Sequence, residues 1–284
     1  MIRYFYYKPL SLDDALELKA KLPGSTFIAG GTDLLVKIRN GEAQPTDLIS
    51  LRSIPELQGI EENGVTRIGA MTTLAELLEH PTLGTRYPVL AEAAARHSGP
   101  QIRNVATIGG NLCNCSPCAD TATPLLVLDA RARLQSAEGS RELPLHELFR
   151  GPGETCLAQG EILTDILLDP PREKAVGTFM KKGRVQMDLA VASCAVLLEM
   201  EGDTCSCARI AAGSVAPVAL RLEKAEKMLE GSTITKEILE QVEEIAAKSV
   251  SPITDIRATE EYRRRIVGVY TRRAIEQLID RAGK

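Results

Sequence analysis

The sequence predicts an α+β protein made of three packed units, and three observations carry this prediction. The chain has 284 residues, 44% hydrophobic and 25% charged, which suits two or three cores rather than one. Strand-like and helix-like segments alternate in its first half. Its last part starts with strands around a Glu201-Gly202-Asp203 turn and continues with helices, as in an antiparallel sheet covered by helices on one face.

The first unit is expected over residues 1–57. Its first helix begins after Ser11, which forms an S-x-x-[DE] capping box with Asp14, and Pro23-Gly24 ends that helix. The remaining elements, in chain order, are a strand over 26–29 that runs into Gly30-Gly31, a short helix that ends near Gly41, and a strand over 48–51.

The other two units are expected over 58–171 and 177–284, because Pro170-Pro171 reads as a linker. In the last unit Cys205 and Cys207 alternate along a strand, so we expect them to share one buried face. The elements predicted for these two units are strands over 67–71, 130–135, 162–168, 189–200 and 205–212, and helices over 74–79, 89–97, 220–229, 236–248 and 260–282.

A glycine pair follows the strand over 26–29, in the segment FIAGGTDLL. Glycines between a strand and a helix let the backbone turn tightly and approach a ligand closely. The amides of Gly31, Thr32 and Asp33 would then open the helix and suit a pyrophosphate, although Thr32 or Asp33 could equally be an N-cap. The segment alone is also compatible with a purely structural turn.

A second glycine pair lies in ATIGGNLCNCSPCAD, residues 106–120. Here too we expect a strand-like entry followed by Gly109-Gly110 with amides free to meet a ligand. Thr107 and Asn111 can hydrogen-bond, and Asp120 can accept from a ribose hydroxyl. Two such turns suit a ligand with two phosphates and a long body. Neither the G-x-G-x-x-G fingerprint of a Rossmann site nor a P-loop occurs in the sequence.

Charge and hydropathy narrow the possible functions. A net charge of −4 and a pI near 5.6 argue against nucleic-acid binding. The basic cluster Arg263-Arg264-Arg265 alternates with apolar residues, which predicts a solvated helix face, with partner docking as the alternative. The sequence has neither a run of roughly 18 apolar residues, the length that spans a membrane, nor a secretory pattern, so we expect no membrane insertion and a cytoplasmic location.

Six ordered motifs give the chain a specific resemblance. It resembles the FAD-binding subunit of the xanthine dehydrogenase and carbon monoxide dehydrogenase group of molybdenum hydroxylases. The resemblance implies a vanillyl-alcohol-oxidase (PCMH)-type fold, in which two small α/β units hold FAD and a C-terminal antiparallel sheet with helices covers the flavin side. The motifs are FYYKPLSLDDALEL, RIGAMTTLAEL, GPQIRNVATIGGN, GEILTDILLDPP, FMKKGRVQMDLAVAS and IAAGSVAPVALRLEKAEKMLEG.

The resemblance also implies which residues hold FAD. One wall of the site would bind the pyrophosphate, and a second wall would face it from the other glycine pair. The first wall would be Ala29, Gly30, Gly31, Thr32, Asp33 and Leu34, and the second Thr107, Gly109, Gly110 and Asn111.

Five further residues match positions around the flavin. Asp120 would lie near the ribose or pyrophosphate, and His97 stands where relatives often place an aromatic contact. Ile162 or Leu163 would pack on the flavin or adenine, and Lys181 would approach the isoalloxazine edge, where it could favour an anionic reduced flavin. Without the family, Ile162 and Leu163 read as strand core and Lys181 as a surface charge.

Family membership implies partners as well. FAD would take electrons from [2Fe–2S] clusters on a small subunit, which are reduced by a molybdopterin-binding large subunit, and pass them to NAD or another acceptor. The chain lacks the plant-type C-x4-C-x2-C run, so we expect those groups on other chains. The alternatives are a self-contained flavin oxidase, for which the last ~110 residues are a small substrate domain, and a non-enzymatic iron–sulfur or zinc module.

Three cysteines follow the second glycine pair closely. Cys113, Cys115 and Cys118 form a C-x-C-x2-C pattern that could hold an iron–sulfur cluster or zinc, with Cys156 the nearest candidate for a fourth ligand. Ordinary replacement of small residues is the favoured interpretation. We therefore assign no metal ligand and keep an additional cluster as an alternative.

Overall fold

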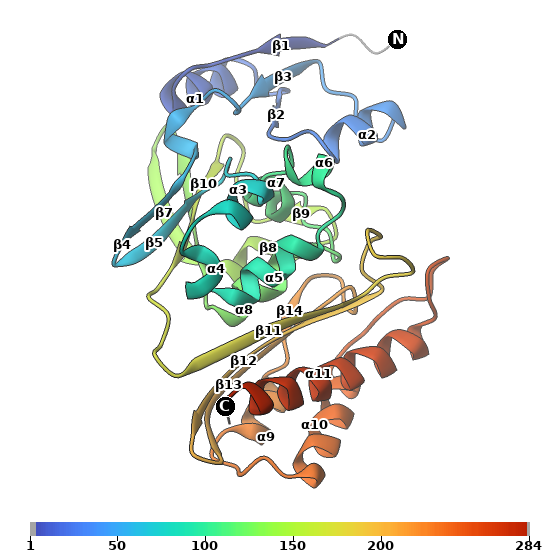
Figure 1. Cartoon of the computed structure of the whole chain (residues 1–284). Helices are drawn as coiled ribbons and strands as arrows, with labels where there is room; N and C mark the ends of the chain where they lie inside the picture. The colour runs from blue at the N-terminus through green and yellow to red at the C-terminus, as the bar shows by residue number, and fades with distance from the viewer. Residues whose placement is uncertain (1–3, 283–284) are drawn as a thin grey trace.

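The computed structural model describes residues 4–282 and arranges them around three β-sheets and a short two-stranded ribbon. Figure 1 shows the sheets stacked from the N-terminal end at the top to the C-terminal end at the bottom. Within the described range, no helix is both long and apolar enough to cross a membrane.

The N-terminal sheet is parallel and has the strand order β1-β3-β2. Helices α1 and α2 are its crossover connections, as parallel strands require. The Ser11 hydroxyl accepts a hydrogen bond from the Asp14 amide at 3.1 Å, so the predicted cap of α1 is confirmed. The elements are β1 (Phe5–Tyr7), α1 (Leu12–Lys21), β2 (Thr26–Ile28), α2 (Leu34–Arg39) and β3 (Asp47–Ser50).

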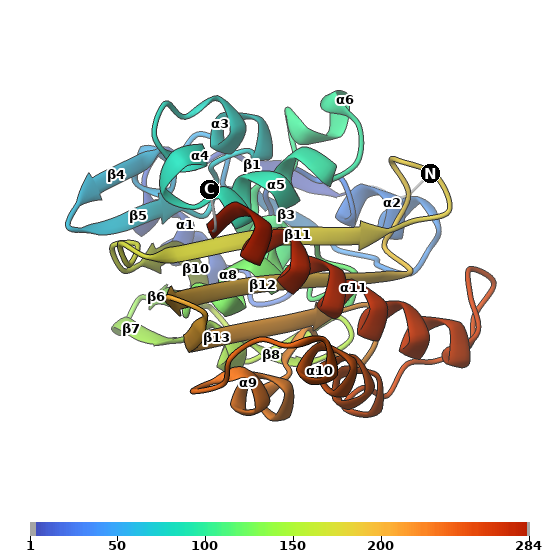
Figure 2. The ribbon, with the colours of Figure 1, turned by 60° about the horizontal axis from the view of Figure 1, so that its bottom comes forward.

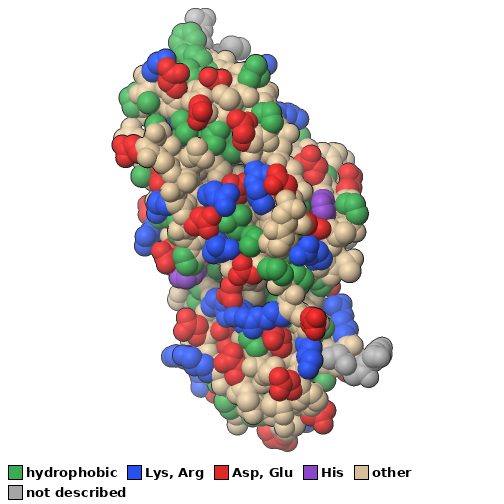
Figure 3. All heavy atoms as spheres, turned by 90° about the vertical axis from the view of Figure 1, so that its left-hand side faces the viewer, with side chains coloured by type: hydrophobic (Ala, Val, Ile, Leu, Met, Phe, Trp, Pro, Cys, Tyr) green, Lys and Arg blue, Asp and Glu red, His purple; other side chains and the backbone are tan. Residues whose placement is uncertain are grey.

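The middle sheet is antiparallel, in the order β4-β5-β10-β6-β7. Its central strand, β10, is buried at every position, and five of its seven residues are apolar. The two polar residues have partners on the neighbouring strands: Thr164 donates to the Arg133 carbonyl at 3.1 Å, and Asp165 pairs with Arg67. On β6 the side chains of Arg131 and Arg133 turn outward and pair with Glu142. Figure 3 shows positive and negative side chains intermixed over this side of the molecule. The strands are β4 (Ile60–Asn63), β5 (Val65–Gly69), β6 (Arg131–Ser136), β7 (Gly139–Pro144) and β10 (Ile162–Leu168).

Short helices cover the inner face of the middle sheet and share its largest apolar core. This core also takes residues from the third sheet, such as Phe179 and Ala195, so the two parts are packed together. The remaining elements of this part are η1 (Pro55–Leu57), α3 (Leu74–Glu79), α4 (Leu83–Arg86), α5 (Pro88–Arg96), α6 (Pro100–Arg103), α7 (Ile108–Cys113), α8 (Ala122–Val127), η2 (Leu145–Leu148), β8 (Phe149–Gly151) and β9 (Glu154–Thr155).

The C-terminal sheet is antiparallel, in the order β11-β12-β13-β14, and both of its faces are buried. Figure 2 shows α9, α10 and α11 on one side of this sheet. That face packs on the three helices through residues such as Cys194 and Val196, and the other face packs on α5 and α8. The elements are β11 (Ala175–Lys182), β12 (Ala192–Glu201), β13 (Thr204–Gly213), β14 (Leu220–Arg221), α9 (Glu223–Leu229), α10 (Lys236–Lys248) and α11 (Glu260–Ala282).

The predicted elements mostly occur where expected. The strand over 162–168 and the helices over 74–79, 236–248 and 260–282 have the predicted bounds. The helix expected over 220–229 is shorter, because residues 220–221 pair with β13 as β14. The sequence did not predict strands β1, β4, β7, β8, β9 and β11.

The prediction that Cys205 and Cys207 share one face is wrong. The pairing of β12 with β13 shifts by one residue between Glu199 and Met200, which is a β-bulge. Cys205 is therefore buried in the helix-covered core. Cys207 lies on the other side, where Arg209 Nη1 donates to its sulfur at 2.6 Å.

The predicted solvated face of α11 is also wrong at one position. Arg263 is 3% exposed, and its guanidinium donates to the carbonyl oxygens of Val191 and Ser214 at 2.7 and 3.0 Å. It also pairs with Asp255 at 2.7 Å. This arginine ties α11 to the loops at one end of the C-terminal sheet, a use that an alternating charge pattern does not reveal.

Candidate functional site

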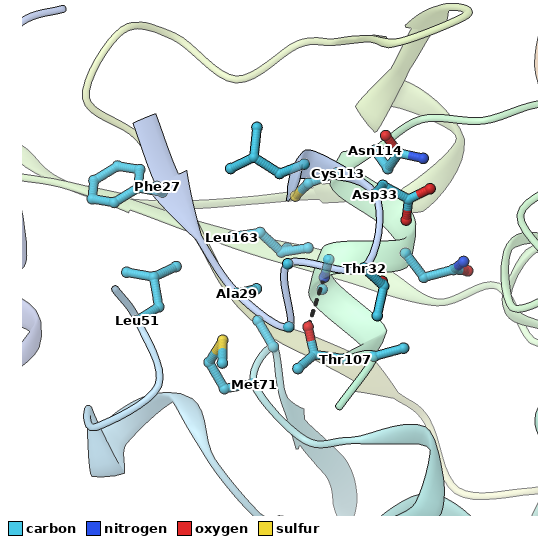
Figure 4. Close-up of a pocket in the computed structure, with 18 of the residues that line it drawn as sticks. Phe27, Ala29, Thr32, Asp33, Leu51, Met71, Thr107, Cys113, Asn114 and Leu163 are labelled. Carbon is cyan, nitrogen blue, oxygen red and sulfur yellow. Dashed lines mark hydrogen bonds between the residues drawn. The ribbon is translucent and has the colours of Figure 1, made fainter. Parts of the chain in front are cut away.

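A cavity of about 280 Å³ lies between the β2–α2 segment and the middle part of the molecule. Figure 4 shows side chains from both sides pointing into it. Its lining residues are Thr26, Phe27, Ala29, Gly30, Gly31, Thr32, Asp33, Leu34, Lys37, Leu51, Ala70, Met71, His97, Ala106, Thr107, Gly109, Gly110, Asn111, Cys113, Asn114, Gly153, Leu157, Glu161, Ile162 and Leu163.

The first wall is the connection from β2 to α2. Gly31 adopts a φ of +75°, a left-handed conformation that favours glycine, and it turns the chain into the helix. Asp33 occupies the N-cap position of α2 without a side-chain capping bond. Within residues 4–282, the backbone amides of residues 30–33 have no hydrogen-bond acceptor. The first glycine pair therefore offers free amides to the cavity, as predicted.

The two walls touch at Gly30. A Cβ atom at this position would overlap the carbonyl oxygen of Val105, directly before the second glycine segment. Only glycine allows this approach, because any side chain would push the two backbones apart. Gly30 therefore sets the separation of the walls.

The second wall differs from the prediction of a strand-like entry with free glycine amides. Residues 108–113 form helix α7, and the Thr107 hydroxyl caps it by accepting from the Gly110 amide at 3.0 Å. The Gly109 amide donates to Ala70 at 2.8 Å. A Cβ at Gly109 would come within 2.6 Å of the Ala70 Cβ. This pair thus permits close packing of α7 and leaves room in the cavity, but its amides are already used.

Apolar side chains line the part of the cavity away from the free amides. Phe27 and Leu51 come from the first unit, and Met71 and Leu163 from the middle one, as Figure 4 shows. Ile162, next to Leu163 on β10, completes this group. Such surfaces suit the flat faces of aromatic rings.

A buried ionic group adjoins the cavity. His97, at the end of α5, lines the cavity and its Nδ1 lies 3.0 Å from Asp120 Oδ2. The Lys181 ammonium donates to the same oxygen at 2.8 Å. The side chains of Asp120 and Lys181 are only 4% and 5% exposed, so Lys181 is not a surface charge. The second oxygen of Asp120 is buried and has no hydrogen-bond partner in the described part of the chain.

The cavity thus gathers thirteen of the fifteen residues predicted for the site. Asp120 and Lys181 are the exceptions, and they reach it only through His97. Sequence reasoning missed Lys37, which lies one helical turn after Leu34, and Asn114, which follows α7. The spacing of Leu34 and Lys37 could have indicated the first, since residues three apart share a helix face.

Cys113 ends α7 and Cys115 and Cys118 follow it, but the three thiols make separate contacts. Cys115 donates to the carbonyl oxygen of Glu154 at 3.0 Å, and Cys118 lies 3.6 Å from that of Ala190. Among residues 4–282, no group of three His, Cys, Asp or Glu side chains is placed to hold a metal ion. Cys113 lines the cavity, and burial, with the neighbouring Cys115 and Cys156, raises the pKa of its thiol to about 12.

These features fit a dinucleotide cofactor with a flavin. Free amides at residues 30–33 suit a pyrophosphate. The apolar walls suit the ring systems, and the buried Asp120 carboxylate holds His97 at the edge of the cavity. Two glycine-dependent walls in front of a sheet covered by helices define the class as an FAD-binding flavoprotein.

Comparison with known families gives the same class in finer detail. Residues 2–170 match the model for the FAD binding domain in molybdopterin dehydrogenase. Residues 177–278 match that for the CO dehydrogenase flavoprotein C-terminal domain. The chain belongs to this family of FAD-binding subunits of molybdenum-containing dehydrogenases, and the predicted fold class is confirmed.

Individual relatives extend the match over the whole chain. The xanthine dehydrogenase FAD-binding subunit of Escherichia coli O157:H7 is 33% identical, with 98% of this chain and 97% of that one covered. A solved carbon monoxide dehydrogenase from Hydrogenophaga pseudoflava superposes with a TM-score of 0.94 at 35% identity, covering 96% of each chain. Quinoline 2-oxidoreductase from Pseudomonas putida 86 also gives 0.94, at 28% identity and with 99% and 98% covered.

Proposed function

We propose that this chain is the electron-transferring subunit of a molybdenum hydroxylase complex. It takes electrons from [2Fe–2S] clusters of a small partner subunit, which a molybdopterin-binding large subunit reduces, and delivers them to NAD or another acceptor. The observation that carries this proposal is the cavity, whose free amides and apolar walls suit FAD. Relatives named as medium chains of such enzymes support it too.

The chain's own contribution is to hold and orient the cofactor. FAD supplies the redox chemistry when it is bound. We propose that the amides of residues 30–33 bind the pyrophosphate and that Ile162 and Leu163 pack on a ring system. Thr107, Gly109, Gly110 and Asn111 form the opposite wall.

The ionic group beside the cavity tunes the site. We propose that Asp120 acts on the ribose or pyrophosphate side of the cofactor through His97, which lines the cavity, while Lys181 neutralises the carboxylate. Because Lys181 is neutralised by Asp120, its effect on the flavin acts through that carboxylate rather than as an isolated charge. If Lys181→Met left both the flavin potential and acceptor turnover unchanged, this role would be refuted.

The partner assignment is tested by reconstitution. The full-length chain, loaded with FAD, is mixed anaerobically with a reduced small subunit that carries two [2Fe–2S] clusters, taken from the same organism, and flavin bleaching is followed. We expect reduction only when that subunit is present. A flavin reduced directly by an organic substrate, without partner chains, would instead favour a self-contained flavin oxidase.

Two coarser expectations belong to the same proposal. We propose that residues 1–57, 58–171 and 177–284 are separate units, and limited proteolysis should cut first near residues 171–177. The complex is proposed to work in the cytoplasm, which fractionation of the producing cells would test.

A further inference from the structure

A hydrogen bond connects the two walls of the cavity. The Lys37 ammonium, on α2, donates to the side-chain oxygen of Asn114 at 2.7 Å, and the two residues are 77 positions apart. Asn114 is the C-cap of α7, so the bond joins the helix that follows the first glycine pair to the helix that contains the second. Both side chains line the cavity. The bond is partly buried, whereas the i,i+4 pairs of Lys21 with Glu17 and of Lys248 with Glu244 are exposed.

The charges around the cavity make Lys37 distinctive. Glu161 is neutralised by Arg141, which holds it through two contacts of 2.7 and 2.8 Å and lowers its pKa. His97 is directed to Asp120. Among the described lining residues, Lys37 is therefore the side chain that carries a permanent positive charge, while Asp33 adds a negative one. A pyrophosphate beside the free amides of residues 30–33 would face Asp33 without another counter-ion.

We propose that Lys37 is the counter-ion of the FAD pyrophosphate and that Asn114 fixes it there. An ammonium group has several N–H donors, so it can keep its bond to Asn114 and still donate to phosphate oxygens. The Asn114 amide nitrogen has no partner among residues 4–282 and can donate as well. The pair would close the cavity across the bound pyrophosphate. This assignment rests on FAD being held in this cavity, as proposed above.

Arg39 provides the matched comparison. It lies on the same short helix and carries the same charge, but it is exposed, and no side-chain hydrogen bond or ion pair of Arg39 occurs within the described range. If Lys37 acted only through the general field of α2, replacing either residue would have a similar effect. If it acts on the pyrophosphate, only Lys37 matters.

FAD affinity of the full-length chain is the first test. We expect Lys37→Met to raise the FAD dissociation constant by at least about tenfold and to flatten its salt dependence. Lys37→Arg should stay within about threefold, and Arg39→Met within about twofold, of the natural chain. Thermal unfolding of each unliganded variant checks that the fold is intact. Equal affinities for the natural chain and the Lys37→Met variant would overturn the proposal.

A second test separates the pyrophosphate from the rest of the ligand. By calorimetry, Lys37→Met should weaken binding of ADP by about tenfold or more, but binding of adenosine by less than about twofold. Asn114→Ala should give a smaller loss for ADP. Equal losses for ADP and adenosine would overturn the counter-ion role and leave only a wall contact.

The two proposals can fail separately. ADP binding that depends on Lys37, combined with no electron transfer from the partner subunits, would sustain this inference and refute the proposed function. Normal electron transfer with unchanged FAD and ADP affinity in Lys37→Met would refute this inference and sustain the proposed function.

Discussion

The cofactor cavity and the C-terminal unit are built by opposite means. Around the cavity, α2, α6 and α7 have only 4 to 6 residues, and the backbone amides of residues 30–33 lack partners within the described chain. In the C-terminal unit, β12 and β13 have 10 residues each and α11 has 23. Helices shorter than roughly 12 residues are marginal on their own, so α2 and α7 depend on tertiary contacts.

Because of this difference, we expect the cavity to determine FAD binding and the C-terminal unit to determine stability. The cavity keeps hydrogen-bonding capacity for a ligand and relies on glycines to bring its walls together. In the C-terminal unit, long strands pair along most of their length, and both faces of the sheet are buried in apolar cores. Changes in the first region should therefore alter FAD affinity, and changes in the second should alter the free energy of unfolding.

The largest effect is expected at Gly30. In Gly30→Ala the new methyl group would overlap the Val105 carbonyl and push the two walls apart. We expect the FAD dissociation constant to rise by at least about a hundredfold, the equivalent of about 3 kcal/mol. Flavin fluorescence titration measures it. The control is Gly24→Ala, where the methyl group would meet only the Thr46 hydroxyl at 3.9 Å. Similar FAD affinity in Gly30→Ala and Gly24→Ala would contradict the claim that Gly30 sets the separation of the cavity walls.

The buried pair of Asp120 and Lys181 should affect both FAD affinity and the free energy of unfolding. Asp120→Asn leaves Lys181 buried without its anion, and we expect the free energy of unfolding to fall by about 3 kcal/mol. Chemical denaturation measures this change. The double variant Asp120→Asn/Lys181→Met should recover part of the loss, because the pair is coupled. Asp188→Asn, which breaks an ion pair with the exposed Arg184, should leave the denaturation midpoint nearly unchanged.

In the C-terminal unit, truncation of a core side chain should change only stability. Ile275, on α11, is fully buried, and Ile275→Ala should lower the free energy of unfolding by about 2 to 4 kcal/mol. The folded variant should bind FAD as the natural chain does. Ile253→Ala, at a position that is 70% exposed, should change neither quantity. A large drop in FAD affinity in Ile275→Ala would contradict the expectation that changes in the C-terminal unit alter stability alone.

The smallest effect is a pH dependence in the loop before α11. Burial raises the pKa of Asp255, but hydrogen bonds from the Arg257 amide and the Arg263 guanidinium outweigh burial and bring the pKa to about 2. Its folded pKa lies below its unfolded value, so its stabilisation is complete above about pH 4 and is lost as the pH falls through 2. Allowing for partial exposure, we expect about 1 to 2 kcal/mol.

Melting temperatures between pH 5 and 2 would test this prediction. The natural chain should lose stability over this range more steeply than Asp255→Asn, which lacks the titrating group. Parallel curves for the two proteins would refute it.

The sequence predicted regular elements well and close contacts poorly. Helices such as 236–248 and 260–282 are long and periodic, so local pattern defines them. Helix α7 was misread as a strand entry, because Thr107 caps it and Gly109 packs on Ala70 from a distant segment. The β-bulge that separates Cys205 from Cys207 likewise depends on the partner strand.

The site was predicted through its glycines and through family resemblance. Gly30 and Gly31 are recognisable because they stand between a strand and a helix. Lys37 and Asn114 were missed because 77 residues separate them, and only the folded chain brings them together. Asp120 and Lys181 were predicted to contact the cofactor but do not line the cavity, and their mutual ion pair could not be inferred from spacing.

Hydrogen–deuterium exchange of the full-length chain with and without FAD tests the central claim most directly. Without FAD, the amides of residues 30–33 have no acceptor and should exchange rapidly, whereas those of α10 and α11 should be protected throughout. Binding of FAD should slow exchange at residues 30–33 by at least about tenfold and leave α10 and α11 unchanged. Unchanged exchange at residues 30–33 on saturation with FAD would contradict the account.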